Sequence, residues 1–181
     1  MEAIMTPMQP VLETLRLNLR PVQKADAGLI SLYSSDFRVA RMTTRIPHPN
    51  PPGAVELFIE QTQKEIEEGG MTWAVDGTPG FGTPLVGMIS LSKDGELGYW
   101  IAPFFWGLGI ATEAAKCVAG YARSRGDARV WAGAFCDNPA SQNVLRKAGL
   151  MACGDRELFS VARNETVKSL LFERRFEDGQ D

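Results

Sequence analysis

A pair of glycines lies in the segment Trp106-Gly107-Leu108-Gly109-Ile110-Ala111, directly before a helical pattern. Two small residues leave main-chain N–H groups uncovered where the helix begins, and that end of a helix carries the positive half of its dipole. Such a loop can bind a phosphate or pyrophosphate through its backbone. A tight strand-to-helix turn without a ligand explains the same residues equally well. The segment fits neither the P-loop, which requires Gly-Lys-Ser/Thr, nor the dinucleotide fingerprint, which requires a third glycine.

The loop is the middle of a strand-loop-helix unit that must position it. Residues 96–102, with the sequence ELGYWIA, are rich in aromatic and β-branched side chains, and Pro103 ends the strand because it cannot donate a ladder hydrogen bond. After the loop, apolar residues recur at the spacing of one helical face: Ala111, Ala114, Ala115, Val118, Ala119 and Ala122. The sequence therefore predicts a strand that leads into the glycine loop and a buried helix that follows it.

Shorter patterns on both sides of this unit predict the remaining elements. Residues 14–20 alternate, with Leu15, Leu17 and Leu19 on one face, as in a half-buried strand. Strands are expected over residues 14–20, 73–75, 85–91, 96–102, 129–135, 156–162 and 166–174, and helices over residues 24–34, 55–66, 111–122 and 139–148. Hairpins favour antiparallel pairing, and the passage from 96 to 135 favours one parallel, right-handed crossover. We therefore expect an α/β (α+β) fold with a mixed, mostly antiparallel, twisted sheet of about seven strands and helices on both faces.

Length and composition limit the class of protein. The chain has 181 residues, of which 44% are hydrophobic and 23% are charged, which suits one domain with a sizeable core. We expect a flexible arm over residues 1–11, a single domain over residues 12–176 and a tail over residues 177–181. The net charge of -3 provides no basic field for binding nucleic acid.

Cysteine usage and hydropathy indicate the cellular setting. Cys117, Cys136 and Cys153 are an odd number without metal-ligand spacing, so neither a disulfide framework nor a metal site is expected. Residues 1–10 lack the basic start and the apolar run of a signal peptide, and no stretch of about 20 apolar residues could span a membrane. The expectation is a cytoplasmic protein that does not bind a membrane.

Four segments, in their order and at their intervals, resemble the GNAT superfamily of N-acetyltransferases. They are ETLRLNLRP, ELGYWIAP, FWGLGIATEA and NPASQNVLRKAGL, and the resemblance covers nearly the whole chain. Within the superfamily, the chain resembles the group that contains the bacterial ribosomal-protein N-terminal acetyltransferases. The resemblance implies a fold whose central parallel strands splay apart, acetyl-CoA as the cosubstrate and a primary amine as the acceptor. Dimers are common among such relatives, so a homodimer is a further expectation.

The resemblance implies a donor site residue by residue. The family's phosphate loop, Gln/Arg-x-x-Gly-x-Gly/Ala, falls on residues 106–111, with Trp106 where Gln or Arg is commoner. Its main-chain N–H groups are implied to hold the pyrophosphate of acetyl-CoA: Trp106, Gly107, Leu108, Gly109, Ile110, Ala111 and Thr112. The Ile101 N–H group is the implied donor to the thioester carbonyl, in an oxyanion-hole role. Asn138 matches the asparagine that contacts the pantetheine arm, and it is also a good N-cap for a helix that begins at Pro139.

Acetyl transfer also needs a proton or hydrogen-bond donor for the departing thiolate. Many relatives use a tyrosine seven positions after the asparagine, but that position here is Leu145. In the ribosomal-protein group, a serine three positions after the asparagine is the proposed donor to sulfur, which implies Ser141 in this chain. The alternative is a serine in the first helical turn that bonds back to the cap.

Several residues are candidates for the base that deprotonates the amine. Glu96 begins the central strand near the place where acceptor and cosubstrate should meet, although an ordinary glutamate in solvent is the alternative. Glu113 lies in the first turn of the central helix, where the dipole favours an acid for structural reasons. His48, the only histidine, is a loop residue, an acceptor contact or a base. Cys136 could carry the acetyl group covalently, but members of the family normally transfer it directly.

Two functions fit these expectations. The first is an enzyme that moves acetyl directly from acetyl-CoA to a primary amine, which is either a protein N-terminal α-amine or a small-molecule amine. The second is a non-catalytic CoA-binding sensor or scaffold with the same fold. Leu145 in the place of the usual tyrosine favours the second function, and Ser141 argues against it.

Overall fold

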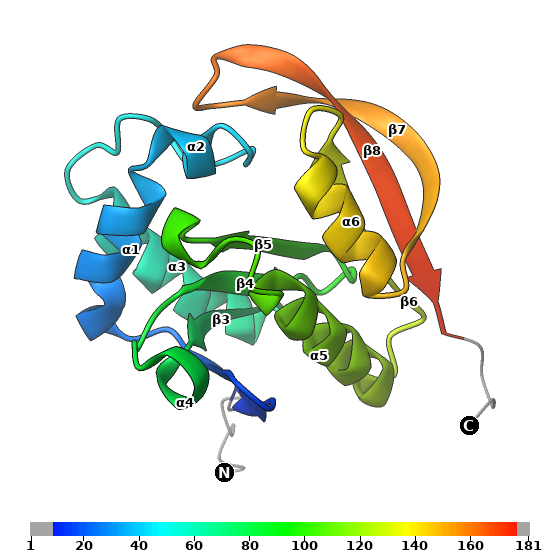
Figure 1. Ribbon diagram of the computed structural model, residues 1–181, viewed down its shortest axis with the longest axis horizontal. Coiled ribbons are helices and arrows are strands. Elements are labelled where there is room, and N and C mark those ends of the chain that lie inside the picture. The colour runs from blue at the N-terminus through cyan, green and yellow to red at the C-terminus, as the bar shows by residue number, and fades with distance from the viewer. Residues whose placement is uncertain (1–8, 177–181) are drawn as a thin grey trace, which may run out of the picture.

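A computed structural model describes residues 9–176 as two sheets with helices packed around them (Figure 1). The larger sheet contains β1 (Leu12–Glu13), β2 (Asn18–Pro21), β3 (Met71–Asp76), β4 (Gly87–Leu91) and β5 (Leu97–Ile101). The smaller sheet contains β6 (Arg129–Phe135), β7 (Met151–Ser160) and β8 (Glu165–Arg175). The helices are α1 (Ala27–Ser34), α2 (Phe37–Ala40), α3 (Ala54–Glu67), α4 (Thr78–Phe81), α5 (Ile110–Arg125) and α6 (Pro139–Lys147), with 3-10 turns η1 (Lys24–Asp26) and η2 (Pro103–Phe105).

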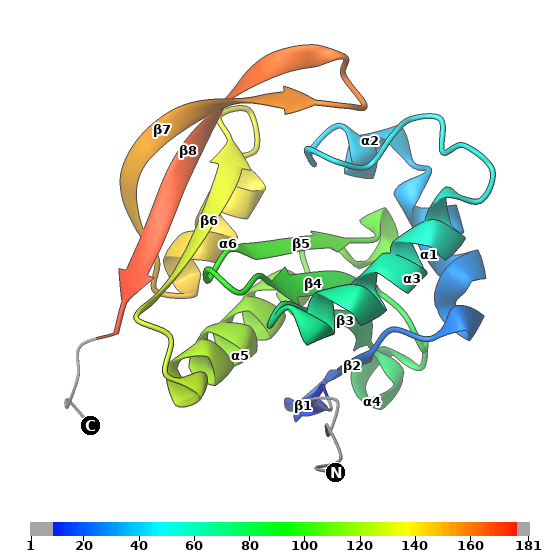
Figure 2. The same ribbon diagram turned by 180° about the vertical axis from the view of Figure 1, so that it is seen from behind.

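The two sheets touch at one point and then diverge. The larger sheet is antiparallel in the order β1-β2-β3-β4-β5, and the smaller sheet is antiparallel in the order β6-β8-β7. Among residues 9–176 they meet at a parallel bridge between Glu96 and Trp131, where the Trp131 N–H group donates to the Gly95 carbonyl oxygen at 2.9 Å. Beyond this bridge β5 and β6 separate (Figures 1 and 2). The predicted mixed sheet with splayed parallel strands is confirmed.

Helices cover both faces of the larger sheet, each over its own hydrophobic core. On one face, Ile30 of α1 and Ile59 of α3 pack with Ala74 and Met88 of the sheet. On the other face lie α5 and α6, and the predicted apolar face of α5 is buried: Ala114, Ala115, Val118, Ala119 and Ala122. Because side chains on one helical face recur every 3.6 residues, this burial could be predicted from the sequence. This packing fixes the position of α5, which begins directly after the glycine loop.

The strand predicted over residues 14–20 is interrupted. The chain turns at Thr14, whose N–H group donates to the Leu17 carbonyl oxygen at 2.9 Å, and β2 begins only after this turn. Leu17 and Leu19 are fully buried, as the alternation predicts, but Leu15 is 91% exposed. The prediction is wrong for Leu15 because a turn breaks the two-residue period of a strand, so the side chain does not face the core.

The ends of the chain are described in part. Residues 1–8 and 177–181, which contain most of the expected arm and the expected tail, lie outside the described residues. Gln9 and Pro10 contact β3: Gln9 Nε2 donates to the Thr72 carbonyl oxygen at 2.9 Å, and Trp73 Nε1 donates to the Pro10 carbonyl oxygen at 2.8 Å. In the described part of the chain, every helix is too short or too polar to cross a membrane.

Candidate active site

The outer edge of β5 presents backbone groups to the gap between β5 and β6. Alternate residues of β5 and its flanks pair with β4: Ser92 N–H donates to the Glu96 carbonyl oxygen at 2.9 Å, and Ala102 N–H donates to the Val86 carbonyl oxygen at 2.8 Å. Since the hydrogen-bonding direction alternates along an antiparallel strand, the residues between these pairs turn their N–H and C=O groups the other way. Ile101 is one of them, so its N–H group faces the gap.

Trp106 fastens the glycine loop to the end of β5. Its indole Nε1 donates to the Ile101 carbonyl oxygen at 2.6 Å, while 48% of the residue stays exposed. The Arg38 guanidinium lies over the exposed ring, 5.8 Å from its centroid. The indole therefore holds the start of the loop against the strand that precedes it.

The glycine loop has the backbone conformation of an anion site. Gly107 and Gly109 both have a φ of 77°, in the left-handed region that favours glycine. Gly109 is the N-cap of α5 and has no side chain to cap it, and the Glu113 N–H group makes the first intrahelical bond, to the Gly109 carbonyl oxygen at 3.0 Å. The first turn of α5 thus has N–H groups without an intrahelical acceptor: Ile110, Ala111 and Thr112. These groups can bind an anion.

Glu113 supports this loop and is a structural residue. Its Oε1 accepts hydrogen bonds from Thr14 Oγ1 at 2.7 Å and from Arg16 N–H at 3.0 Å, and its Oε2 accepts one from Arg16 Nε at 2.8 Å. Partial burial raises the pKa of Glu113, but these hydrogen bonds and the Arg16 charge outweigh burial and hold it below its usual value. The Arg16 guanidinium also donates to the Leu108 carbonyl oxygen at 3.1 Å. Arg16 and Glu113 together therefore stabilise the glycine loop.

Asn138 and Ser141 lie together at the start of α6. The Asn138 Oδ1 atom accepts a hydrogen bond from the Ser141 N–H group at 3.1 Å, so the predicted N-cap is present. The Asn138 side-chain amide group donates no hydrogen bond within residues 9–176, which leaves its two hydrogens for a ligand. Leu145, at the position where many relatives have tyrosine, is fully buried in the core. The hydroxyl group that α6 contributes to the site is therefore that of Ser141.

Tyr99 of β5 brings a second hydroxyl to Ser141, and sequence reasoning missed it. The Tyr99 Oη and Ser141 Oγ atoms are 2.7 Å apart, and either hydroxyl can be the donor. The Ser141 carbonyl oxygen, 3.2 Å from Tyr99 Oη, is a second acceptor within reach of the one phenolic proton. Burial raises the pKa of Tyr99 to about 12, although the Ser141 hydrogen bond lowers it, so the phenol stays protonated. One signal could have found this residue: Tyr99 stands two positions before Ile101, so its side chain shares the sheet face that α6 covers.

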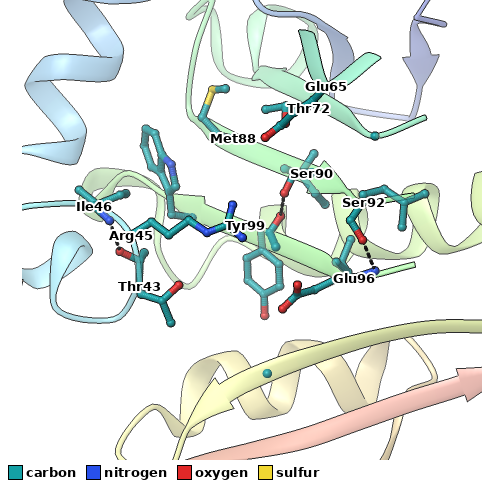
Figure 3. Close-up of a pocket in the computed structure, with 18 of the residues that line it drawn as sticks. Thr43, Arg45, Ile46, Glu65, Thr72, Met88, Ser90, Ser92, Glu96 and Tyr99 are labelled. Carbon is teal, nitrogen blue, oxygen red and sulfur yellow. Dashed lines mark hydrogen bonds between the residues drawn. The ribbon is translucent and has the colours of Figure 1, made fainter. Parts of the chain in front are cut away.

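A cleft of about 730 Å³ reaches the Tyr99 side chain. Its walls come from the segment 42–46, from β3, β4 and β5, and from β7. Figure 3 shows the polar ends of Glu96 and Tyr99 pointing the same way, with Arg45 extending toward them from the segment 42–46. The cleft can therefore hold a substrate against the same strand whose edge carries the Ile101 N–H group.

Glu96, the expected base, lies in this cleft and is paired at one oxygen. Its Oε1 atom is 3.1 Å from Arg156 Nη2 on β7, and the Arg156 guanidinium lies over the Trp131 ring, 5.0 Å from its centroid. The Glu96 side chain is 37% exposed. A carboxylate that pairs through one oxygen keeps the other for an amine or a water, so Glu96 can still accept a proton.

The tip of the β7–β8 hairpin contacts the segment 41–44, next to Phe159 of β7 and residues 42–46, which line the cleft. The Val161 N–H group donates to the Thr44 carbonyl oxygen at 3.1 Å, and Ser160 Oγ donates to the Thr43 carbonyl oxygen at 3.2 Å. Figure 1 shows this hairpin reaching across from the smaller sheet toward α2. The cleft is therefore covered at this end by two segments that are distant in the sequence.

Arg163 ties these two segments to the start of α6. Its side chain is 8% exposed, and it donates to both carboxylate oxygens of Asp137, at 2.8 and 3.0 Å. Its Nε atom donates to the Arg41 carbonyl oxygen at 2.6 Å, and its guanidinium lies 5.0 Å from the centroid of the Phe135 ring. Because Asp137 directly precedes Asn138, the cover of the cleft and the cap of α6 are joined.

The other candidate side chains lie apart from these groups. His48 is exposed, its ring centroid is 5.0 Å from that of Phe37, and it does not line the cleft, which fits a loop residue. Cys136 is exposed after the end of β6. In the part of the chain that the structure describes, no three His, Cys, Asp or Glu side chains gather as metal ligands.

Comparisons with known proteins bear on the family. The family model for the acetyltransferase (GNAT) domain matches residues 16–151. The Bacillus subtilis protein described as uncharacterized N-acetyltransferase YoaA is 30% identical over 156 residues, which cover 81% of this chain and 86% of that protein. Both matches include the strand, the glycine loop and the helix that form the centre of the site.

Solved structures share the fold at lower identity. RimL, a ribosomal L7/L12 alpha-N-protein acetyltransferase in complex with coenzyme A, has a TM-score of 0.79 at 14% identity, over 92% of this chain and 98% of that chain. The microcin C7 self immunity acetyltransferase MccE, in complex with acetyl-CoA and AMP, has a TM-score of 0.77 at 16% identity, over 89% of this chain and 93% of that chain. The family model and the B. subtilis relative decide the family: the chain belongs to the GNAT acetyltransferases and is an acyltransferase whose family implies acetyl transfer from acetyl-CoA.

Proposed function

We propose that this enzyme transfers the acetyl group of acetyl-CoA directly to a primary amine bound in the cleft between β5 and the β7–β8 hairpin. The observation that carries the proposal is that three groups from two segments lie along β5. They are the Ile101 N–H group at its edge, the Ser141 hydroxyl at the start of α6, and the Glu96 carboxylate in the cleft. Acyl transfer to an amine requires an oxyanion donor, a donor to sulfur and a base, which are the roles that these groups can fill.

Backbone groups would bind the donor. The uncovered N–H groups of residues 106–112 provide a place for the pyrophosphate. The pantetheine arm is rich in amides and fits the gap between β5 and β6, because an added strand can satisfy the N–H and C=O groups of a sheet edge. The Asn138 amide hydrogens beside this gap support the same placement.

The chemistry follows from these positions. The amine, whose conjugate acid has a pKa of about 8 for an N-terminus, loses a proton to Glu96 directly or through a water. Its nitrogen then attacks the thioester carbon, and the Ile101 N–H group stabilises the negative oxygen of the tetrahedral intermediate. As the C–S bond breaks, the departing thiolate accepts a hydrogen bond from Ser141, and the second proton that the nitrogen loses on becoming an amide ends on sulfur, which gives the CoA thiol. The products are the acetylated amine and CoA, and nothing is oxidised or reduced.

Two chemical sources of the amine fit the proposal. RimL is named for a protein α-amine and MccE for immunity to a microcin, and their TM-scores of 0.79 and 0.77 are similar, so the fold does not choose between them. The cleft is lined by Leu158 and Phe159 of β7, next to the hairpin tip, and by residues 42–46. Because these segments close one end of the cleft, they favour an acceptor whose amine is at the end of the molecule. Such an acceptor is either the N-terminus of a protein or a small molecule.

The test is release of CoA thiol from acetyl-CoA with a panel of N-terminal peptides and small amines. Ser141→Ala removes the donor to sulfur and should lower kcat about 10- to 100-fold, because a hydrogen bond to a charged group contributes ~1.5–3 kcal/mol. The dissociation constant of acetyl-CoA should stay unchanged.

Ser124→Ala is the matched control, because Ser124 is exposed in α5 and its hydroxyl only contacts the Tyr121 carbonyl oxygen, at 2.8 Å. It should change neither kcat nor acetyl-CoA affinity. Tight binding of acetyl-CoA without thiol release from any amine would contradict the proposed function. An unchanged kcat in Ser141→Ala would remove the role of the serine alone.

A further inference from the structure

The contact between Tyr99 and Ser141 joins the two halves of the site. Tyr99 lies in the middle of β5, the edge strand of the larger sheet, and Ser141 lies in the first turn of α6, which follows β6 of the smaller sheet. Their hydroxyl oxygens are 2.7 Å apart, although 42 positions separate the residues. We propose that Tyr99 is a positioning residue for acetyl transfer, whose phenol donates to Ser141 and turns the serine proton toward the departing sulfur. This inference rests on the proposed function.

Each hydroxyl of the pair has one proton, so the direction of the hydrogen bond between them decides whether the serine proton is available to the sulfur. A serine hydroxyl has one proton and two lone pairs. If Ser141 donated to Tyr99, its only proton would point at the phenol, and the departing thiolate would face a lone pair. If Tyr99 directs its single proton to Ser141 Oγ at 2.7 Å, and not to the Ser141 carbonyl oxygen at 3.2 Å, it fills one lone pair of Ser141, and the serine proton is left for the sulfur. The growing negative charge on sulfur favours this second arrangement, because hydrogen bonds to an ionised acceptor are the stronger ones.

The phenol acts as a hydrogen-bond donor and keeps its proton. Burial raises the pKa of Tyr99 to about 12, whereas an ordinary thiol has a pKa of about 8.5. Full transfer of the phenolic proton through Ser141 to sulfur is therefore unfavourable. Tyr99 instead orients Ser141 and, when it donates to the serine oxygen, increases the polarity of the serine O–H bond.

Both partners are held by backbone structure, so the pair is preorganised. The residues that flank Tyr99, Gly98 and Trp100, pair with Ser90 and Met88 of β4. The Ser141 N–H group is bound by the Asn138 cap at 3.1 Å. The Ser141 carbonyl oxygen lies 3.2 Å from Tyr99 Oη, farther away than Ser141 Oγ at 2.7 Å, and is the competing acceptor for the phenolic proton. A site built on a strand and a helix start keeps such geometry better than one built on loops.

The test is a double-mutant cycle on kcat, with saturating acetyl-CoA and the amine that the wild-type enzyme acetylates fastest. Tyr99→Phe keeps the ring and removes the donor, and kcat should fall about 3- to 10-fold while the dissociation constant of acetyl-CoA and the KM of the amine stay unchanged. In the Ser141→Ala background, the same substitution should have no further effect, because the hydroxyl that Tyr99 orients is gone.

Tyr121→Phe is the matched control. The Tyr121 phenol contacts Met71 Sδ at 3.3 Å and its ring meets the Trp73 ring edge-on, so it is a part-buried tyrosine without a link to Ser141. Its substitution should leave kcat unchanged, and the binding of acetyl-CoA by every variant shows that the fold is intact.

Two results would overturn the role of Tyr99. The first is an unchanged kcat in Tyr99→Phe, and the second is an equal loss in both backgrounds, which would mean that Tyr99 acts without Ser141. A weaker affinity for acetyl-CoA that accompanies the loss would indicate a purely structural role and would also overturn the inference. Failure of the proposed function looks different: the wild-type enzyme then binds acetyl-CoA but releases no thiol with any amine, and the role of Tyr99 falls with it.

Discussion

Trp106 occupies a position where the resembled family more often has Gln or Arg, and its contacts give a physical reason for an indole there. Its Nε1 donates to the Ile101 carbonyl oxygen at 2.6 Å, while the Ile101 N–H group faces the gap between β5 and β6. The two polar groups of Ile101 are thus divided between two tasks. The carbonyl oxygen holds the glycine loop, and the N–H group faces the gap, where the proposed contact with the thioester would form.

Trp106→Phe tests this division because it keeps an aromatic ring and removes the indole N–H group. The loop should lose its attachment to β5, and the dissociation constant of acetyl-CoA in calorimetry should rise about 2- to 10-fold, since one hydrogen bond contributes ~0.5–1.5 kcal/mol. Trp131→Phe is the control, because it removes an indole bond of the same kind at the opposite end of β5, to the Asp94 carbonyl oxygen at 3.1 Å. Equal affinities of Trp106→Phe and the wild type would show that the loop keeps its shape without the indole.

Among the elements, the glycine loop depends on the turn between β1 and β2 as well as on α5. Glu113 in the first turn of α5 binds Thr14 and Arg16 of that turn, and Arg16 reaches the Leu108 carbonyl oxygen. An acid in the first turn of a helix also interacts favourably with the helix dipole. One carboxylate therefore joins the start of α5, the glycine loop and the first hairpin.

Glu113→Gln should lower the free energy of unfolding at pH 7 by about 1–3 kcal/mol, because it weakens hydrogen bonds to a charged group. Partial burial raises the pKa of Glu113, but the hydrogen bonds from Thr14 and Arg16 outweigh it, so the pKa is lower in the folded than in the unfolded chain. The carboxylate then stabilises the fold above the unfolded pKa, and this contribution is lost as the pH falls through the folded pKa. Urea unfolding from pH 7 downward should show the difference between variant and wild type shrinking.

The exposed Glu67 on α3 provides the control for this measurement. Glu67→Gln should change the free energy of unfolding by less than about 0.5 kcal/mol at every pH, as surface substitutions usually do. If the effect of Glu113→Gln does not vary with pH, the ionised carboxylate is not its source.

At the scale of the whole molecule, the smaller sheet has two junctions, one with the larger sheet and one with the segment 41–44 after α2. The first junction is the parallel bridge between Glu96 and Trp131. The second is the tip of the β7–β8 hairpin, which contacts the segment 41–44 through Ser160 and Val161. Because the smaller sheet is held at both junctions, the gap and the cleft between them can stay open.

Arg163→Met should loosen the second junction. Methionine keeps apolar contact with Phe135 but cannot pair with Asp137 or with the Arg41 carbonyl oxygen. The free energy of unfolding should fall by about 1–3 kcal/mol, and the KM of the amine should rise about 3- to 10-fold because the cover of the cleft is less well fixed. Steady-state kinetics at saturating acetyl-CoA, together with urea unfolding, measures both quantities.

Arg175→Met is the control for this prediction, since the exposed pair of Arg175 with Glu173 is a surface salt bridge. Such pairs contribute about 0–1 kcal/mol, and the KM of the amine should not change. If Arg163→Met also leaves that KM unchanged, the cleft keeps its shape without the tie.

Features that depend on near neighbours could be predicted from the sequence. The start of α5 at Gly109 and the cap of α6 at Asn138 are specified by the residue types that stand there, because a left-handed backbone favours glycine and an N-cap favours a side-chain acceptor. The buried face of α5 followed from its 3.6-residue period. The strand-loop-helix order then indicated the mixed sheet and the parallel crossover. At Leu15 an unforeseen turn broke the period, and the local pattern misled; it also missed α4 and placed the start of β7 at residue 156, five residues too late.

The tertiary structure decided which distant side chains meet. Tyr99 is 42 positions from Ser141, Glu96 is 60 positions from Arg156, and Arg163 is 26 positions from Asp137. No periodicity or capping signal links such pairs, because their distance depends on how far two sheets diverge and on how a hairpin crosses between them. That geometry is a sum of many weak packing contacts spread over the whole chain, whereas the glycine loop and the helix caps depend on the conformational preferences of a few consecutive residues.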